Sequence, residues 1–368
     1  MRVLLAAAVS LAAAAVSAAG AAGPHTVNLV SLGSGTISAF AQDGPLIAWF
    51  TPNRKSCNTV HVRSLSNGLH AELPRQADAR NVTCRWTVGG SPVTLAVARK
   101  TSNVLWTLHE NSPLAFDYLV GAGAGDERER RFQELAHTNR GAGLWFGGVA
   151  GNGATLAYGV TSVDYEDEAG CLAGTASCAM KIAGGGVYRI AGRQSPRLIP
   201  GTGPAVAVAA SDGKIAYIEA GSITKHGMPV AGATAAIKVV DAARGRVIST
   251  IRAQGTPVAI ALSAHVLATL ERTRLGLRLA WYTPSGSPSG SVPVAIATSP
   301  ALTVSDQLVV FHVGRSIRAV EIATGRVKTL VTAAAQPIGL SIEGGRLAWA
   351  ENRKHSARIR ALYVTGRG

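Results

Sequence analysis

The sequence predicts an all-β fold, because a short apolar core recurs along the chain and each copy follows a sequence typical of a tight turn, such as Asp212-Gly213. A second motif follows each core, and it consists of two apolar segments joined at a glycine, as in IKVVDAARGRVISTI from Ile237. Each unit therefore supplies four short strands at a period of about 40 to 50 residues, which is typical of a β-propeller blade. The seven cores are Ile47–Trp49, Leu95–Val97, Leu156–Tyr158, Ile215–Tyr217, Leu267–Thr269, Val309–Phe311 and Leu347–Trp349.

The repeat also predicts a single domain. Seven blades of about 45 residues each fill most of the 368 residues, so we expect residues 22–368 to form one seven-bladed propeller of four-stranded antiparallel blades. The last unit reaches Gly368 after its third strand, which leaves its outermost strand to be supplied. We expect the apolar stretch from His25 to Leu32 to pair there and close the ring, because an unpaired strand edge is a liability.

Residues 1–21 are typical of a secretory signal peptide. Arg2 gives a short positive start, an Ala- and Leu-rich run follows, and small residues surround the expected cleavage region. A retained membrane anchor is the alternative, but the run is short and alanine-rich compared with the ~20 strongly apolar residues that a membrane span needs. We therefore expect an extracytoplasmic protein, secreted or held in the cell envelope such as the periplasm, with no transmembrane span in the mature chain.

Four cysteines in an exported chain indicate disulfides rather than a zinc site, which needs closely spaced pairs of ligands. We favour the pairs Cys57–Cys84 and Cys171–Cys178, although four cysteines allow three pairings. No metal-ligand motif of defined spacing occurs, so the sequence predicts neither a metal site nor another cofactor.

The turn and core of the fourth unit carry a family resemblance. The stretch Ser211–Tyr217 (SDGKIAY) resembles the repeat signature of TolB-like propellers, a periplasmic WD40-like group. The match lacks the proline that the signature has between serine and aspartate, and no α/β domain precedes the propeller as it does in TolB. The resemblance implies a propeller fold and export, but it does not carry over TolB's partnership with the Pal lipoprotein.

The expected channel lining argues against catalysis. The innermost strands are rich in Ala, Val, Gly, Ile, Leu and Ser, with Arg85 as their only charged residue, whereas acid–base or metal chemistry needs several convergent His, Asp or Glu side chains. We therefore expect a non-catalytic binding or scaffold protein. The alternative is a hydrolase or lyase with its site in the loops of one face. These strands are expected at residues 36–42, 82–88, 144–150, 205–210, 257–262, 301–304 and 337–342.

Basic residues recur in the expected connections between the second and third strands, which all emerge on one face of a propeller. The net charge of +15 favours acidic partners, such as an anionic cell-envelope polymer, a lipid surface or a protein. Nucleic acid is not expected, because no aromatic residues alternate with the basic ones to stack on bases. The alternative is that these are solvated loop charges. The predicted binding residues are Arg54, Lys55, Arg99, Lys100, Arg353, Lys354 and His355.

One connection is acidic instead. The third unit inserts DYEDEAGCLAGTASC, in which four carboxylates precede the Cys171/Cys178 pair. Such a cluster can hold Ca²⁺, which prefers several oxygen ligands, or it can form a solvated acidic loop, and the sequence does not decide between these. The four residues are Asp164, Glu166, Asp167 and Glu168.

Overall fold

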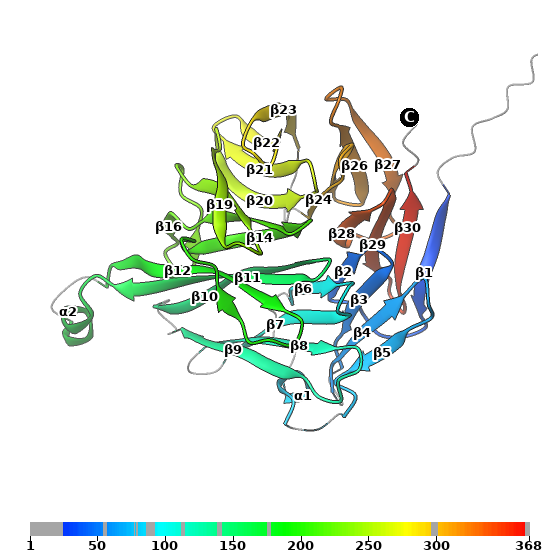
Figure 1. Ribbon diagram of the computed structural model, residues 1–368, viewed down its shortest axis with the longest axis horizontal. Helices are drawn as coiled ribbons and strands as arrows, with labels where there is room; N and C mark the ends of the chain where they lie inside the picture. Colours follow the sequence, from blue (N-terminus) through cyan, green and yellow to red (C-terminus); the bar gives the residue numbers. More distant parts are fainter. Residues whose placement is uncertain are drawn as a thin grey trace, which may run out of the picture.

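The computed structural model describes residues 25–53, 57–76, 78, 80–85, 93–111, 115–137, 142–174, 178–295 and 301–364. It shows a seven-bladed β-propeller of four-stranded antiparallel blades (Figure 1), which confirms the predicted fold class. Each innermost strand contacts the innermost strands of both neighbouring blades, so that the seven strands form a closed ring. Of the helices within these described ranges, none is long and apolar enough to cross a membrane.

The strands of each blade run in order from the channel outward. Blades 1 to 3 are β2 (Ala39–Asp43), β3 (Leu46–Thr51), β4 (Thr59–Ser64) and β5 (His70–Leu73); β6 (Leu95–Ala98), β7 (Asn103–Asn111), β8 (Ala115–Gly123) and β9 (Arg130–His137); and β10 (Gly143–Asn152), β11 (Thr155–Tyr165), β12 (Met180–Ala191) and β13 (Arg197–Leu198). Two short helices, α1 (Val82–Arg85) and α2 (Glu168–Ala173), lie before blade 2 and within blade 3.

The remaining four blades follow the same order. They are β14 (Ala205–Ser211), β15 (Lys214–Glu219), β18 (Ala236–Asp241) and β19 (Arg246–Arg252); β20 (Thr256–Leu262), β21 (Leu267–Thr273), β22 (Gly276–Tyr282) and β23 (Pro288–Val294); β24 (Leu302–Val304), β25 (Leu308–Val313), β26 (Ser316–Glu321) and β27 (Val327–Thr332); and β28 (Ile338–Glu343), β29 (Arg346–Asn352), β30 (Ala357–Tyr363) and β1 (Thr26–Leu32). A small hairpin of β16 (Ser222–Ile223) and β17 (Pro229–Val230) is inserted in blade 4.

The repeated apolar core forms the second strand in six of the blades. This strand has a partner on each side and a neighbouring blade against each face, so nearly every residue is buried, as in β3 and β29. A strand covered on both faces is expected to be continuously apolar rather than alternating. The short turn before it suits the motif, since Asp212 and Gly213 both adopt positive φ angles of 47° and 71°, the backbone geometry that two-residue hairpin turns favour.

Blade 2 departs from the sequence prediction by one strand. Residues 82–85 form helix α1, and Cys84 within it is disulfide-bonded to Cys57, so the innermost strand expected at 82–88 is wrong. The core Leu95–Val97 lies in the innermost strand β6, and the second strand is β7. Arg85 therefore belongs to a helix and not to a channel-lining strand.

The strand expected from residues 25–32 is β1, and it pairs antiparallel with β30 (Figure 1, blue beside red). Val30 packs with Ala357 and Ile359 in the cluster between blades 7 and 1. On the other side of β30, the guanidinium of Arg360 lies over the ring of Trp349, 5.8 Å from its centroid, and Arg360 also donates a hydrogen bond to the Thr26 hydroxyl. Blade 7 is thus assembled from both ends of the described chain.

We predict that deleting residues 25–32 lowers the melting temperature of the protein by roughly 5–10 °C, since the loss of several buried contacts in a domain of this size shifts melting by that order. The deletion also exposes the edge of β30, so aggregation should increase. Calorimetry and light scattering measure both effects. Val27→Ser, at a position 41% exposed on the same strand, serves as the control and should melt like the parent. A deletion variant that melts like the parent would contradict the prediction.

Candidate functional site

The predicted basic residues do not all lie on one face. Arg353, Lys354 and His355 are exposed in the turn between β29 and β30, a connection between second and third strands, as expected. Arg99 and Lys100 lie in the turn between β6 and β7, a connection between first and second strands, so their expected placement beside the others is wrong. The cause is the one-strand shift in blade 2. Arg54 and Lys55 lie outside the described residues.

We call the end of the ring that carries the first-to-second turns the turn face, and the opposite end, which carries the second-to-third connections, the loop face. Asp43 of blade 1 is fully buried on the turn face. Its carboxylate accepts hydrogen bonds from the backbone N–H groups of Arg99 in blade 2 and Gly153 in blade 3, both at 2.7 Å, and lies 3.7 Å from the Arg99 guanidinium. One side chain therefore holds the turns of three blades together.

Hydrogen bonds continue from turn to turn around this face. Each joins a side chain of one blade to the inner strand or turn of another, so the polar groups of these turns are largely used within the ring. They run from Gly44 N to Glu343, from Asp212 N to Asn152 Oδ1, from Lys214 Nζ to the Ala264 carbonyl, from Ser263 Oγ to Asp306 Oδ1 and from Ile342 N to Thr303 Oγ1.

A hollow of about 390 Å³ opens among the turns of blades 3 to 7, with Asp306 and Glu343 in its lining. Burial and the nearby charge of Asp43 raise the pKa of Glu343 to about 7, a value suited to proton transfer near neutral pH. The lining includes no histidine, lysine or cysteine, and Asp306 already accepts a hydrogen bond from Ser263. Asp306 and Glu343 therefore both take part in the hydrogen bonds that join neighbouring blades at this face.

Glutamates at the ends of second strands anchor the loop face in a repeated way, and two of them, Glu271 and Glu351, are fully buried. In blades 4, 5 and 7 the core motif ends in a glutamate that forms an ion pair with a basic residue of the third strand, and in blades 5 and 7 the same glutamate accepts a backbone N–H from the segment entering the blade, as Glu351 does from Ala334 at 2.9 Å. The connections of this face therefore start from fixed points. The pairs are Glu219–Lys238, Glu271–Arg278 and Glu351–Arg358.

The connection of blade 3 is a long, braced hairpin. Strands β11 and β12 project beyond the ring and carry α2 at their tip (Figure 1, left). The Asp167 carboxylate caps α2 by accepting a hydrogen bond from Gly170 N at 2.9 Å, and Cys171 is bonded to Cys178 as expected. At least one of the four clustered carboxylates thus has a structural role. The side chain of Leu172 on α2 is nevertheless 73% exposed.

Two neighbouring blades also expose apolar side chains on the loop face. The β16–β17 hairpin of blade 4 contacts β12 of blade 3 and presents Met228, which is 48% exposed. The turn between β21 and β22 of blade 5 presents Leu275, which is fully exposed. The loop face thus presents an exposed apolar side chain on each of three consecutive blades.

Exposed basic residues accompany Met228 and Leu275 on the loop face, whereas Leu172 follows the exposed acidic residues 166–168 in the chain. Among the residues that the structure describes, none of these basic side chains lies within ion-pair distance of a carboxylate, so the arginine and lysine charges are not neutralised locally. They are Lys225 and His226 in blade 4, Arg272 and Arg274 in blade 5, Arg315 in blade 6, and Arg353, Lys354 and His355 in blade 7.

Comparison with known proteins supports the fold. No family model matches the chain, and no curated protein matches its sequence. Pyrococcus horikoshii acylaminoacyl peptidase is similar in structure with a TM-score of 0.54 at 12% identity, over 88% of this chain and 50% of that one, so the present chain spans half of the peptidase's length. The β-propeller domain of the trilobed protease from Pyrococcus furiosus gives 0.51 at 9%, over 89% and 95%, and that of Myceliophteria thermophila Cps50 (Swd1) gives 0.51 at 11%, over 93% and 100%.

We predict that Asp43→Ala lowers the free energy of unfolding by about 2–4 kcal/mol, because it leaves two N–H donors without their acceptor, and each such unsatisfied group costs about 1–3 kcal/mol. Denaturant unfolding measures the loss. Asp164→Ala removes an exposed carboxylate from β11 and should change stability by no more than ~0.5 kcal/mol. Equal effects of the two substitutions would contradict the proposed role of Asp43.

We predict that ionisation of Glu343 lowers the free energy of unfolding of the protein as the pH rises. Because the folded-state pKa of Glu343 is raised to about 7, its contribution is fully present below the ordinary carboxyl pKa of ~4.3 and is lost as the pH rises through 7. Glu343→Gln cannot ionise, so its melting temperature should fall less than that of the parent between pH 5 and pH 8. The control Glu166→Gln changes an exposed carboxylate and should follow the parent. Parallel pH profiles for Glu343→Gln and the parent would refute the assignment.

Proposed function

We propose that this chain is an exported, non-catalytic β-propeller that binds a protein partner through its loop face. The observation that carries the proposal is the contrast between the two faces. On the turn face, the polar groups bond to one another across blades. On the loop face, a disulfide-braced hairpin and two neighbouring connections hold Leu172, Met228 and Leu275 in solvent. Fixing such side chains before binding reduces the ordering cost of association.

The chemistry of the loop face favours a particular kind of partner. Exposed aliphatic side chains can serve as anchors in apolar hollows of another protein, and the surrounding unpaired cations favour a surface of opposite charge. We therefore expect a protein with an acidic contact surface that contains apolar depressions. Arg353, Lys354 and His355 fit this surface. Arg54 and Lys55 follow β3 and precede β4 in the chain and remain predicted contributors, whereas Arg99 and Lys100 belong to the turn face.

Two observations support export. Both cysteine pairs form disulfides, which persist in oxidising compartments and are rare in the cytosol, and residues 1–21 have the composition of a signal peptide. The resemblance of Ser211–Tyr217 to TolB-like repeats agrees with a secreted or cell-envelope location. A hydrolase or lyase with its site in the same loops is the weaker alternative. Catalysis requires acid–base groups within hydrogen-bond reach of one another, and outside the acidic connection of blade 3 the described loops present mainly cations and apolar side chains.

The test is cross-linking in the native host followed by quantitative mass spectrometry of the captured proteins. Replacing Leu172, Met228 and Leu275 together by Ser should reduce capture of the partner at least tenfold, since buried anchors dominate binding energy. The matched control replaces Val247, Ile248 and Val327, which are also exposed but lie on the outermost strands β19 and β27. The control should bind like the parent. Equal capture by both variants, or no partner enriched by the parent, would contradict the proposal.

A further inference from the structure

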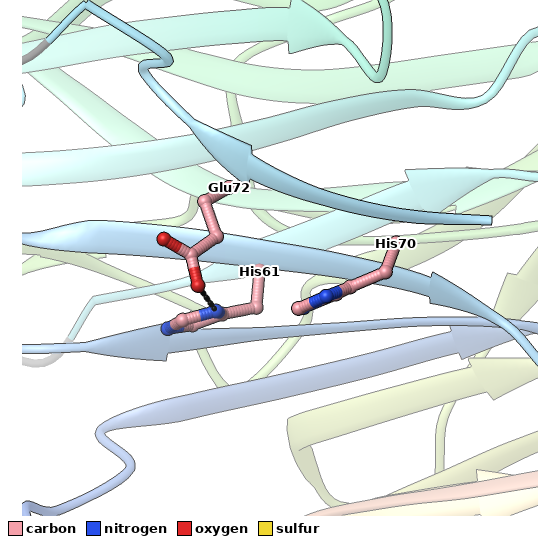
Figure 2. A group of neighbouring side chains, drawn as sticks. All are labelled: His61, His70 and Glu72. Atoms are coloured by element: carbon pink, nitrogen blue, oxygen red, sulfur yellow. Dashed lines mark ion pairs between the residues drawn. The ribbon is translucent and has the colours of Figure 1, made fainter.

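Two histidines and a glutamate meet on the outer half of blade 1. His61 lies on β4, and His70 and Glu72 lie on the next strand, β5. The register pairs His61 directly with Glu72 and pairs Arg63 with His70. Because side chains alternate along a strand, all three point to the same side of the blade, and Figure 2 shows them converging there.

The distances suit a shared cation. One ligand atom from each of the three side chains can be chosen so that all three atoms lie within 4.8 Å of one another. His61 Nδ1 is 3.4 Å from Glu72 Oε1, and two ligands at ~2.1 Å from a tetrahedral zinc ion are about 3.4 Å apart. His70 is exposed, so rotation of its ring can bring its nitrogen to the same separation.

His61, the most buried of the three side chains, has a fixed ring orientation and a nitrogen atom available to bind a metal ion. The ring of His61 stacks on Trp49, with centroids 4.8 Å apart and planes 9° from parallel, which fixes its orientation. Its Nδ1 atom is shielded from solvent and has no hydrogen-bond partner within the described structure. Burial lowers the pKa of His61, and the neutral imidazole that this favours is the form that binds metal ions. A bound cation would satisfy a polar atom that otherwise costs free energy.

The surroundings leave room for further ligands. His70 and Glu72 line a surface hollow of about 400 Å³, so a bound cation would be accessible to water or to a group of another molecule. Arg75 in the lining of the hollow donates to the Ala124 carbonyl at 2.8 Å. Arg63 is paired with His70 across the two strands, and its guanidinium donates to the Leu29 carbonyl of β1 at 3.0 Å. The site therefore adjoins the seam where β1 lies against blade 1.

We propose that His61, His70 and Glu72 bind one divalent transition-metal ion of the Zn²⁺ and Cu²⁺ class. Two imidazole nitrogens with one carboxylate oxygen form a borderline donor set, which suits these ions. Ca²⁺ and Mg²⁺ are poor candidates, because they require six or more oxygen ligands. The proposal is independent of the proposed function, since it uses none of the side chains on which the proposed partner surface rests.

Isothermal titration of the tag-free mature protein with ZnCl₂ at pH 7.5, after chelator treatment and dialysis, tests the site. We expect one equivalent to bind, with no competition from CaCl₂ or MgCl₂. His61→Ala and His70→Ala should each weaken binding at least tenfold, and Glu72→Gln should weaken it severalfold. Two controls, His226→Ala and His265→Ala, remove exposed histidines elsewhere and should leave the affinity unchanged.

Two further measurements separate loss of the site from loss of the fold. His70 and Glu72 are exposed, so His70→Ala and Glu72→Gln should melt like the parent without metal, while Zn²⁺ should raise the melting temperature of the parent alone. With Cu²⁺ in place of Zn²⁺, the electron paramagnetic resonance spectrum of the parent should report imidazole nitrogens. Absence of stoichiometric binding, or binding that the His61 and His70 substitutions leave unchanged, would overturn the proposal.

Discussion

The ring depends on how neighbouring blades satisfy one another's backbone at the turn face, and the buried carboxylate of Asp43 does this for three blades at once. Taking a carboxylate out of water is costly unless hydrogen bonds and a counter-charge replace the lost hydration. The amides of Arg99 and Gly153 and the Arg99 guanidinium supply them. Because these groups come from separate blades, the burial of one charge is favourable only when the blades are correctly docked, so the interaction specifies the arrangement as well as stabilising it.

Because of this arrangement, the connections at the two ends of the ring differ in how much their lengths can vary. The turns of one face are short and bonded to each other, so a longer connection there would break contacts with the next blade. At the other face, Glu219, Glu271 and Glu351 fix where the connections begin, through ion pairs with the third strands. The connections of this face also differ in length, and that of blade 3 carries a helix and a disulfide of its own.

The sequence predicts most of the fold and little of the candidate sites. Six of the seven innermost strands lie close to their expected residues, because the apolar core and the turn before it repeat clearly. Blade 2 fails because Leu95–Val97 resembles the core although it forms the inner strand, while the disulfide at Cys84 lies in a helix where the pattern predicts a strand. The cluster of His61, His70 and Glu72 escapes prediction for another reason: no fixed spacing identifies it, and only the register of β4 and β5 brings the residues together.

The pairing of β1 with β30 also affects the order and the rate of folding. Arg360 and Thr26 are 334 residues apart in sequence, yet they are hydrogen-bonded to each other. Contacts of such long range slow folding, because the entropy of bringing the two segments together is lost before the contacts form. The first blade can assemble from local hairpins, but the last one has to wait for β1 to meet it. We therefore expect docking of this strand to come late in folding, with the intermediate that lacks it as the species most exposed to proteases and to mispairing with other chains.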